Sequence, residues 1–585
     1  MLKTLFKQTK GVRLISVLTP LCMIGEVIME MIVPRLMSSI IDDGVTAGNM
    51  QHIYTVGGWM ILAAIVGLVF GVGGAVFGSA AATGLARNLR KSMFANIQTF
   101  SFANIDKYST AGLVTRMTTD VTNIQNAYQM SLRMSIRAPA SLIVAMVMSF
   151  AINRQLASIY LAAAILLACV LVFIMSHATR YFDQAFHRYD DLNESVQENV
   201  SAIRVVKAYV REKFEGEKFR KASEALRSLF MRAELILSWN SPAMMLTVYS
   251  CILLISWFGA RMIISSGATA FTTGELMSML AYCMNILMSL MMLSMVFVMI
   301  SMSAASAHRV AEVLDEKSDL HDPEEPVMEV KNGAVEFDHV CFRYKKDGRD
   351  VLSDINLNIR SGETIGIIGG TGSAKSSLVQ LLPRLYDVSA GHVRIGGIDV
   401  RNYDLEVLRN SVAMVLQKNE LFSGTIAENL RWGNEHATQE ELEEACRQAC
   451  ADEFIERFPD KYETHIEQGG TNVSGGQKQR LCIARALLKK PKILILDDST
   501  SAVDTATDAK IRKSFADKIP GTTVFIVAQR ISSVESADHV LVLDGGKVSG
   551  YGTPAEMLAT NKIYQEVYNS QKQGGGDFDE KGGEA

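Results

Sequence analysis

Residues 363–376 read ETIGIIGGTGSAKS, an apolar run that passes into a loop of glycine and small polar residues. A segment typical of a helix begins at Ser377, so the order is strand, glycine-rich loop and helix. Such a loop turns its backbone N–H groups toward phosphate, and the N-terminus of the helix adds a positive dipole. We therefore predict a nucleotide-binding loop made of Gly369, Gly370, Thr371, Gly372, Ser373, Ala374, Lys375, Ser376 and Ser377.

Three residues of this loop have distinct expected roles. Lys375 reaches the β- and γ-phosphates of ATP, and the hydroxyl of Ser376 is a ligand for Mg²⁺. Ala374 stands where the loop pattern has glycine, and its methyl group adds bulk, although alanine suits a helical backbone well. We expect the loop to bind ATP and Mg²⁺ despite this departure.

A second acidic element lies downstream, where residues 492–498 read KILILDD. A continuous apolar run fits a central strand of a parallel sheet, which is buried on both faces. Asp497 lies at the tip of this run and is expected to hold Mg²⁺ through water, as the usual partner of such a loop. The second half of the chain is therefore predicted to be an α/β domain that binds ATP.

The first half of the chain differs, because it contains long uncharged apolar stretches. A helix needs about 20 apolar residues to cross the core of a bilayer. By this criterion we predict six spans, at about residues 14–41, 53–86, 132–153, 155–177, 234–262 and 275–303. The segments 87–137 and 177–234 are long and rich in Lys and Arg, which places them in the cytoplasm. Both termini are then expected to be cytoplasmic.

Composition limits the classes of function. The 585 residues carry a formal net charge of −4 and lack the basic excess of nucleic-acid-binding proteins, so no nucleic-acid partner is expected. The eight cysteines show no zinc-ligand spacing and are expected to be reduced and structural.

Two features inside the spans concern cargo. Glu26 and Glu30 share one helix face, and carboxylates inside a membrane often mark a path for substrate or protons. The alternative is that they lie near lipid headgroups or pair with Arg35. Methionines recur at helical spacing in the last span and form a stripe made of Met284, Met288, Met291, Met295 and Met299. Methionine suits surfaces that accept varied apolar ligands, and the alternative is plain helix packing.

The residues between the two nucleotide elements resemble one family. Residues 473–477 read VSGGQ and are followed by KQRLCIARAL, which resembles the signature motif of ABC transporters. Tyr344 resembles the aromatic residue that stacks on adenine, and Gln417 resembles the glutamine that contacts Mg²⁺ and senses the membrane domain. Six spans ahead of such a domain are similar to an ABC exporter half-transporter, and the likeness extends over about residues 10–570.

This resemblance implies a fold, a pairing and a location. The fold is an all-α six-helix transmembrane domain followed by an α/β P-loop ABC ATPase domain, with boundaries at 1–310, a linker at 311–333, 334–570 and a disordered tail at 571–585. Two halves pair, and each ATP lies between the nucleotide loop of one half and the signature of the other. This chain then offers to its partner's ATP the residues Ser474, Gly475, Gly476, Gln477 and Asp504. The family pattern, short outer connections and no evident signal peptide favour a bacterial plasma membrane.

Two residues depart from the family's hydrolytic pattern. Asp498 stands where the family has a glutamate that polarises water, and its carboxylate falls short by one bond length, about 1.5 Å. A misplacement of about 1 Å costs roughly 100-fold in rate. Gln529 stands where the family has the switch histidine, and an amide carries neither a proton nor a positive charge. Because the signature is nearly intact, we predict the hydrolysis-impaired subunit of a heterodimer with a second, non-identical half-transporter.

The predicted function is ATP-driven export of drugs or other amphipathic compounds, with the lipid bilayer and a small-molecule cargo as further partners. A lipid or peptide exporter is the alternative within transport, because the cargo is set by the cavity. A regulatory ABC protein, in which ATP only gates, is the alternative from another class.

Overall fold

The computed structural model describes residues 1–345, 347–498 and 503–573, and these form two compact units. The first unit contains Met1–Gln98 and Ser109–Glu316. The second contains Thr99–Tyr108 and the chain from Lys317 onward, so helix α4 (Phe102–Lys107) groups with the second unit. The predicted tail lies outside the described residues from position 574 onward.

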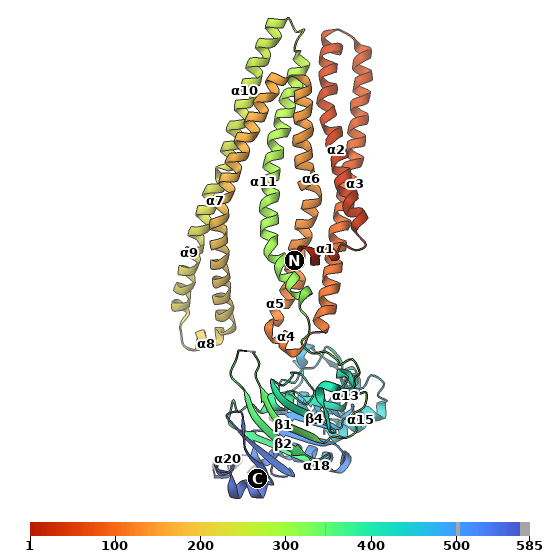
Figure 1. Cartoon of the computed structure of the whole chain (residues 1–585), viewed down its shortest axis with the longest axis vertical. Coiled ribbons are helices and arrows are strands. Elements are labelled where there is room, and N and C mark those ends of the chain that lie inside the picture. Colours follow the sequence, from red (N-terminus) through yellow and green to blue (C-terminus); the bar gives the residue numbers. More distant parts are fainter. Residues whose placement is uncertain (346, 499–502, 574–585) are drawn as a thin grey trace. The chain divides into compact units, whose positions relative to one another are not determined.

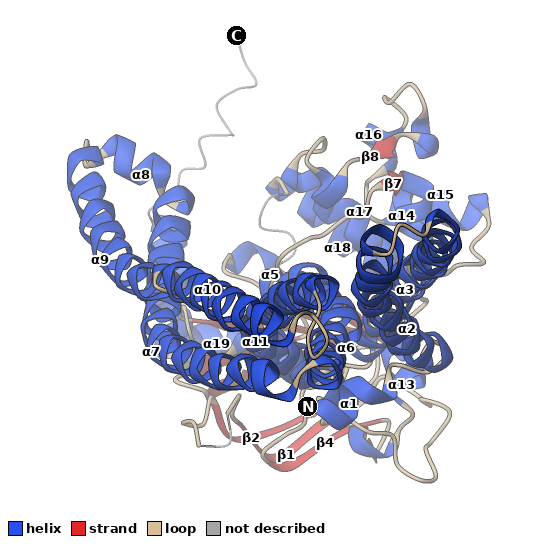
Figure 2. Cartoon of the chain, turned by 90° about the horizontal axis from the view of Figure 1, so that it is seen from above, coloured by secondary structure: helices blue, strands red, loops and turns tan. Residues whose placement is uncertain are grey.

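The first unit is built from helices (Figure 1). Its elements are α1 (Leu2–Lys7), α2 (Arg13–Ser39), η1 (Ile40–Thr46), α3 (Met50–Gln98), α5 (Thr110–Thr115), η2 (Arg116–Asp120), α6 (Val121–Ile152), α7 (Arg154–Ser201), α8 (Ile203–Ala208), α9 (Glu212–Ser238), α10 (Asn240–Ser266) and α11 (Thr273–Asp315). Helices α2 and α3 lie side by side, as do α7 and α9, which α8 connects (Figures 1 and 2).

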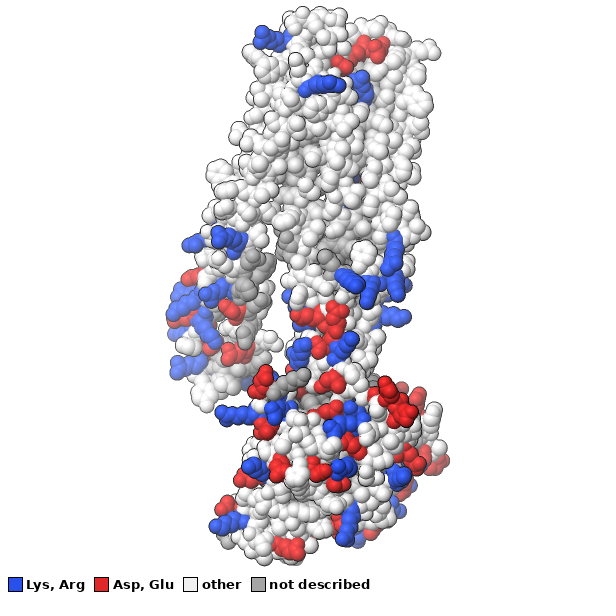
Figure 3. Space-filling model, viewed as in Figure 1, with Lys and Arg blue, Asp and Glu red and all other residues white. Residues whose placement is uncertain are grey.

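Six helical stretches of this unit, within the described residues, are long and apolar enough to cross a membrane. They are Arg13–Thr46, Met50–Gln98, Thr110–Ile152, Arg154–Phe182, Glu212–Ser266 and Thr273–Phe297. Figure 3 shows the corresponding band on the drawn face of this unit, where Lys, Arg, Asp and Glu are nearly absent between two charged zones. The predicted six-helix membrane domain is therefore confirmed.

Local signals in the sequence end and restart these helices. Helix α6 ends just before Asn153, and the Asn153 side chain accepts hydrogen bonds from the first backbone N–H groups of α7. Gly267 ends α10 with φ 61, a left-handed conformation that glycine adopts without strain. Thr272 and Glu275 then form a capping box that starts α11. These caps keep the connections short at this end of the helices.

The second unit is an α/β domain with a mainly parallel sheet. Its six strands lie in the order β12-β11-β3-β10-β9-β6, and β12 alone is antiparallel to its neighbour. The strands are β3 (Thr364–Gly369), β6 (Val412–Val415), β9 (Ile493–Asp497), β10 (Thr523–Val527), β11 (His539–Asp544) and β12 (Lys547–Gly552). A second sheet, order β2-β1-β4-β5, is antiparallel and contains β1 (Val335–Phe342), β2 (Leu352–Ile359), β4 (Ala390–Ile395) and β5 (Ile398–Asp399).

Helices and short elements complete this unit. The helices are α12 (Lys375–Gln380), α13 (Leu405–Ser411), α14 (Ile426–Arg431), α15 (Gln439–Gln448), α16 (Asp452–Ile455), α17 (Gly475–Leu487), α18 (Thr505–Lys518), α19 (Pro554–Thr560) and α20 (Lys562–Gln573). A two-stranded ribbon joins β7 (Gly424–Thr425) to β8 (His465–Ile466). Single 3₁₀ turns lie at Val400–Asn402, Lys461–Glu463, Gln468–Gly470 and Ile531–Ser533.

The parallel sheet separates two apolar cores. In β9 all five residues are buried; Leu494 and Leu496 belong to one core, and Ile493 and Ile495 to the other. This alternation follows from the two-residue period of a strand. The continuous apolar run of the sequence was therefore correctly predicted to be a central strand.

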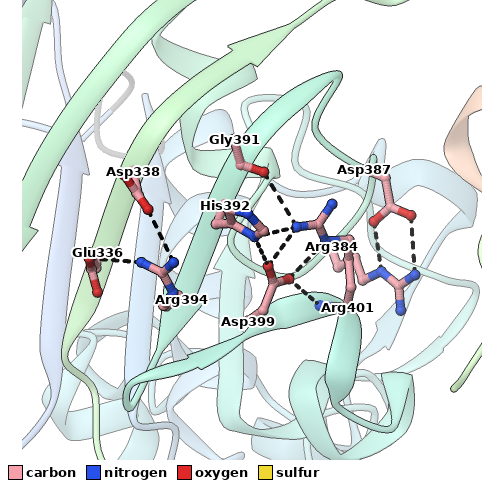
Figure 4. A network of polar contacts seen from close by, with 9 residues as sticks. All are labelled: Glu336, Asp338, Arg384, Asp387, Gly391, His392, Arg394, Asp399 and Arg401. Atoms are coloured by element: carbon pink, nitrogen blue, oxygen red, sulfur yellow. Dashed lines mark hydrogen bonds and ion pairs between the residues drawn. The ribbon is translucent and has the colours of Figure 1, made fainter.

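A polar network braces the antiparallel sheet (Figure 4). Arg394 of β4 pairs with Glu336 at 2.8 Å and with Asp338 at 3.1 Å, both on β1. Arg401 and His392 both contact the carboxylate of Asp399 in the β4–β5 region. Burial raises the pKa of Asp399, but the hydrogen bonds from Arg401 and His392 outweigh burial and hold that pKa at about 2. Asp399 therefore stays ionised, and its charge ties the β4–β5 hairpin to the turn that follows.

Candidate nucleotide site

The predicted nucleotide residues meet at one edge of the parallel sheet. Strand β10 lies between β3 and β9, and Val527 at its end is in register with Asp497 on one side and Ile367 on the other. Gly369 ends β3 and starts the loop, while Gln529 follows β10. Because the carboxyl ends of parallel strands share one edge, the loop, the acidic tip and the switch position lie together, where ligands of such sheets bind.

The loop passes into α12 through Ala374, whose backbone is left-handed at φ 71 and ψ 26. The expectation that alanine would sit there in a helical backbone is wrong, because the left-handed region is unfavourable for a residue with a side chain. Glycine, the residue of the common pattern, adopts such angles freely, as Gly372 does at φ 82 in the same loop. The loop therefore keeps its shape at the cost of local strain.

Lys375 turns its ammonium group back onto the loop. Its Nζ donates to the carbonyl oxygens of Gly369 at 2.8 Å and Gly370 at 3.0 Å. Partial burial lowers the pKa of Lys375, while the negative charges of Asp498 and Asp497 act in the opposite direction. The cation is therefore held inside the loop at the place where phosphate oxygens are expected.

Ser376 and Asp497 provide the oxygen atoms expected to bind a cation. The hydroxyl of Ser376 donates to Oδ1 of Asp497 at 2.8 Å, although the two residues come from different segments. Asp497 is only 3% exposed, and burial raises the pKa of its carboxyl group. A hydroxyl and a carboxylate side by side suit Mg²⁺, which prefers oxygen ligands. These residues therefore fit ATP with its Mg²⁺.

The two unusual residues contact each other. The side-chain amide of Gln529 donates to Oδ2 of Asp498 at 2.9 Å. The backbone N–H of Asp498 donates to the carbonyl oxygen of Val527 at 2.9 Å, and the φ of Asp498 is 49. Gln529 is held in turn by Gln571 of α20, whose amide donates to the Gln529 carbonyl at 2.8 Å and accepts from the Ile531 N–H at 2.8 Å. No sequence motif marked Gln571, because this contact depends on how α20 folds back.

Tyr344 lies beside the loop. Its hydroxyl is 2.8 Å from the Ser377 hydroxyl, and its ring packs edge-on against Phe342 and Tyr386. Tyr344 is 45% exposed, so part of its side chain remains accessible to an aromatic partner. The sequence pointed to Tyr344 but not to Tyr386.

The remaining predicted residues lie outside the loop itself. Gln417 is exposed just after β6. Ser474 caps α17 and forms a capping box with Gln477, so these two side chains bind each other's backbone. Asp504 caps α18, and the hydrogen bond from the backbone N–H of Thr507 lowers its pKa. Gly475 is exposed and Gly476 half-buried in the first turn of α17.

Within the first unit, the predicted acidic pair has a partner that the sequence did not indicate. Arg137 of α6 binds Glu26 at 2.6 Å and Glu30 at 3.0 Å, both on α2. Of the two alternatives, a pair with Arg35 is wrong, because Arg137 binds both carboxylates and Arg35 pairs with Glu275 at 3.5 Å. A position near lipid headgroups stays a prediction. This charged trio lines a cavity of about 530 Å³ together with small residues of α3 such as Gly71. A side chain at Gly71 would lie 3.3 Å from the Glu26 carboxylate, so glycine permits the close approach.

The methionine stripe lies on the exposed side of α11 in this single chain. Met284 and Met288 are each 47% exposed and Met295 is 61% exposed, whereas Tyr282 and Ile286 are buried. Met291 is 37% exposed, and Met299 is half-buried. Packing inside this chain therefore uses a different face of α11 from the face that carries the stripe.

Comparisons with known proteins agree with this architecture. The family model of the ABC transporter transmembrane region matches residues 17–291, and that of the ABC transporter matches residues 352–501. An uncharacterized ABC transporter ATP-binding protein of Bacillus subtilis is 35% identical over 96% of this chain and 97% of its own length. A probable multidrug resistance ABC transporter ATP-binding/permease protein of the same organism is 31% identical, with 93% of each chain covered.

Two further comparisons concern cargo and fold. An ATP-dependent lipid A-core flippase of Desulfotalea psychrophila is 32% identical over 83% of this chain and 84% of its own length. The solved structure of a bacterial Atm1-family ABC exporter with ATP bound superposes with a TM-score of 0.80. It covers 97% of this chain and 99% of the solved chain at 24% identity, and therefore supports the fold alone.

Proposed function

The chain belongs to the ABC transporters, as an exporter half-transporter whose membrane domain is fused to an ABC ATPase domain, and from this premise we propose that it is the hydrolysis-impaired subunit of a heterodimer that exports drugs or other amphipathic compounds. The family couples ATP hydrolysis to transport. The observation that carries the impairment is the hydrogen bond between Gln529 and Asp498, the two positions that depart from the family pattern.

The proposed loss of hydrolysis without loss of ATP binding follows from the chemistry of the side chains at this site. Lys375, Ser376 and Asp497 are retained, so they hold ATP and Mg²⁺, which neutralises phosphate charge when bound. The short carboxylate of Asp498 accepts a hydrogen bond from Gln529 and is therefore poorly placed to orient an attacking water. The amide of Gln529 carries no proton to give. This site then binds ATP and seldom cleaves it.

The partner's site is the working one in this proposal. Ser474, Gly475, Gly476, Gln477 and Asp504 of this chain face the ATP held by the partner's nucleotide loop. The N-terminus of α17 favours an anion there, because 13 helical residues align their peptide dipoles behind it. Hydrolysis in the pair therefore depends on the signature of this chain and on the catalytic glutamate of the other.

The proposed cargo follows from the membrane unit. The exposed methionines of α11 form a flexible, polarizable apolar surface, and the trio of Glu26, Glu30 and Arg137 is a separate polar feature of the same unit. An amphipathic compound matches both features. A lipid is the second candidate cargo, which the 32% identical flippase favours. We place the chain in the plasma membrane of a bacterium with both termini in the cytoplasm.

The proposal is tested by measuring ATPase rates at saturating Mg-ATP for the chain alone and for its complex with a co-purified half-transporter. We expect an active complex, a nearly inactive single chain, and little effect of Asp498→Ala. Replacing the partner's catalytic glutamate by glutamine abolishes activity in this scheme. Brisk hydrolysis by the single chain that Asp498→Ala stops would overturn the heterodimer proposal. Uptake into inverted vesicles is measured separately for ethidium and for a fluorescent phospholipid, and the comparison distinguishes the two cargo classes.

A further inference from the structure

Tyr386 lies between helix α4 and the nucleotide loop, within the second unit. Its hydroxyl donates to Oδ2 of Asp106 in α4 at 2.6 Å. Its ring meets Phe102 of α4 edge-on, with centroids 6.0 Å apart. Burial, followed by the neighbouring Asp106, raises the pKa of Tyr386, so the hydroxyl stays protonated and remains a donor. Both contacts therefore attach α4 to this tyrosine.

The same ring also contacts Tyr344, the residue expected to stack on adenine. Tyr344 and Tyr386 are perpendicular, with centroids 5.2 Å apart, and Phe342 is 5.5 Å from Tyr386. The hydroxyl of Tyr344 is 2.8 Å from the hydroxyl of Ser377, the last residue of the nucleotide loop. An edge-to-face pair has a preferred geometry, so a change in the pose of one ring shifts the other.

Helix α4 is held at its start by further hydrogen bonds. Ser101 and Asn104 form a capping box at its start, and Asn104 also donates to the carbonyl of Lys317 at 3.2 Å. The chain continues from α4 directly into α3 on one side and α5 on the other. A displacement of α4 is therefore passed covalently to two helices of the membrane unit.

We infer that Tyr386 is a positioning residue that couples nucleotide occupancy beside Tyr344 to the placement of α4. Adenine stacked on Tyr344 fixes that ring, the fixed ring restricts Tyr386, and the hydroxyl of Tyr386 holds Asp106. The inference rests on the proposed ATP binding at this chain's own site. It adds a second link, through the base, to any link that runs through the phosphates.

Two tyrosine-to-phenylalanine variants make a matched pair. Tyr386→Phe keeps the ring contacts and removes only the hydroxyl that binds Asp106. Tyr403→Phe is the control, because its hydroxyl also makes one hydrogen bond, to the carbonyl of Ile395 in β4 at 2.8 Å, rather than to α4. Asp106→Ala removes the other partner of the same hydrogen bond, and combining it with Tyr386→Phe adds no further loss if the two act through one contact.

The measurement is hydrogen–deuterium exchange of the full-length chain in lipid nanodiscs, with and without ATP. We expect ATP to slow exchange in segment 99–108 by about fivefold, a typical lower value for coupling between sites. Tyr386→Phe and Asp106→Ala abolish this slowing but keep the slowing in segment 366–380, while Tyr403→Phe keeps both. The inference is overturned if Tyr386→Phe protects 99–108 as well as the wild type does, or if the wild type protects only 366–380. Absence of any ATP effect at 366–380 would instead sink the proposed ATP binding.

Discussion

Asp498 and Gln529 restrain each other, because the amide of Gln529 donates to the carboxylate at 2.9 Å. In the family pattern the corresponding pair is a longer acid and an imidazole that can be charged. Here the acid is one bond shorter, the second side chain is a neutral amide, and the two are hydrogen-bonded to each other. At the residue scale, this contact supports the proposal that the chain binds ATP at its own site and seldom cleaves it.

Restoring the family pattern is the sharpest test at this scale. In a complex whose partner has its catalytic glutamate replaced by glutamine, the double variant Asp498→Glu/Gln529→His should raise ATPase activity by about 100-fold, because the carboxylate advances by one bond length. The measured quantity is the steady-state rate of phosphate release.

The control for this test is Asp498→Asn/Gln529→His, which carries the same histidine but has no carboxylate. It should stay at the background rate. If the double variant with glutamate is equally inactive, the defect of this site lies elsewhere in the loop. Ala374, with its strained φ of 71, is then the next position to change, to glycine.

At the scale of elements, the sequence predicted the strands and loops that depend on local motifs and on periodic apolar residues. The run from Ile493 to Asp497 is buried on both faces and central in its sheet, as a continuous apolar run should be. The loop and the acidic tip were predicted from their motifs and the switch position from the family resemblance. The strand order of the structure brings them together, because parallel strands end at one edge. The left-handed turn at Ala374 was missed, because the residue type there argues against the conformation that the loop imposes.

Contacts between distant segments were not predictable from the same patterns. Arg137 pairs with Glu26 from 111 residues away, and Tyr386 binds Asp106 from 280 residues away. Neither residue belongs to a motif, and an arginine near a span reads equally well as a charge at the membrane surface. Their partners are set by how helices pack, which is information that a single sequence pattern does not carry.

Helix α20 gives a prediction at the scale of elements. Gln571→Ala removes the two hydrogen bonds that hold the backbone at Gln529 and Ile531. If the switch position contacts the γ-phosphate, as the family pattern implies, affinity for ATP should fall by about fivefold, the equivalent of one neutral hydrogen bond. Affinity for ADP should be unchanged. Competition of each nucleotide against a fluorescent analogue on the full chain gives both constants.

The matched control is Gln565→Ala on the same helix. Gln565 donates to the carbonyl of Leu558 at 2.7 Å and does not contact the switch. Equal weakening of ATP and ADP in Gln571→Ala would show that the variant loosens the fold rather than the switch, and an unchanged ATP affinity would show that α20 does not position Gln529.

At the scale of the whole molecule, the trio of Glu26, Glu30 and Arg137 affects the stability of the membrane unit as well as any binding of cargo. Arg137 neutralises one of the two carboxylates of Glu26 and Glu30, which leaves a formal charge of −1 in a cavity otherwise lined by apolar and small residues. Such charges are costly inside a membrane and persist when they pair with one another. The trio therefore has a structural reason to exist, and any role with cargo must be separated from it.

Two variants separate these roles. Arg137→Met leaves two carboxylates uncompensated and should lower the free energy of unfolding by up to about 3 kcal/mol, since breaking a buried pair is costly, with partial exposure reducing the loss. Adding Glu26→Gln and Glu30→Gln removes the uncompensated charge and should restore most of that stability. Thermal unfolding in detergent measures both, and a triple variant no more stable than Arg137→Met would contradict the pairing argument.

The stable triple variant then decides what the trio does in transport. If Glu26 and Glu30 attract a cationic amphiphile, the triple variant assembles with its partner and hydrolyses ATP normally, but ethidium no longer stimulates that hydrolysis or accumulates in inverted vesicles. A Met288→Leu variant is the control, because it preserves apolar volume on the stripe and leaves the charges intact. Wild-type ethidium transport by the triple variant would limit the trio to holding α2 against α6, and would leave the exposed methionines of α11 as the surface that meets the cargo.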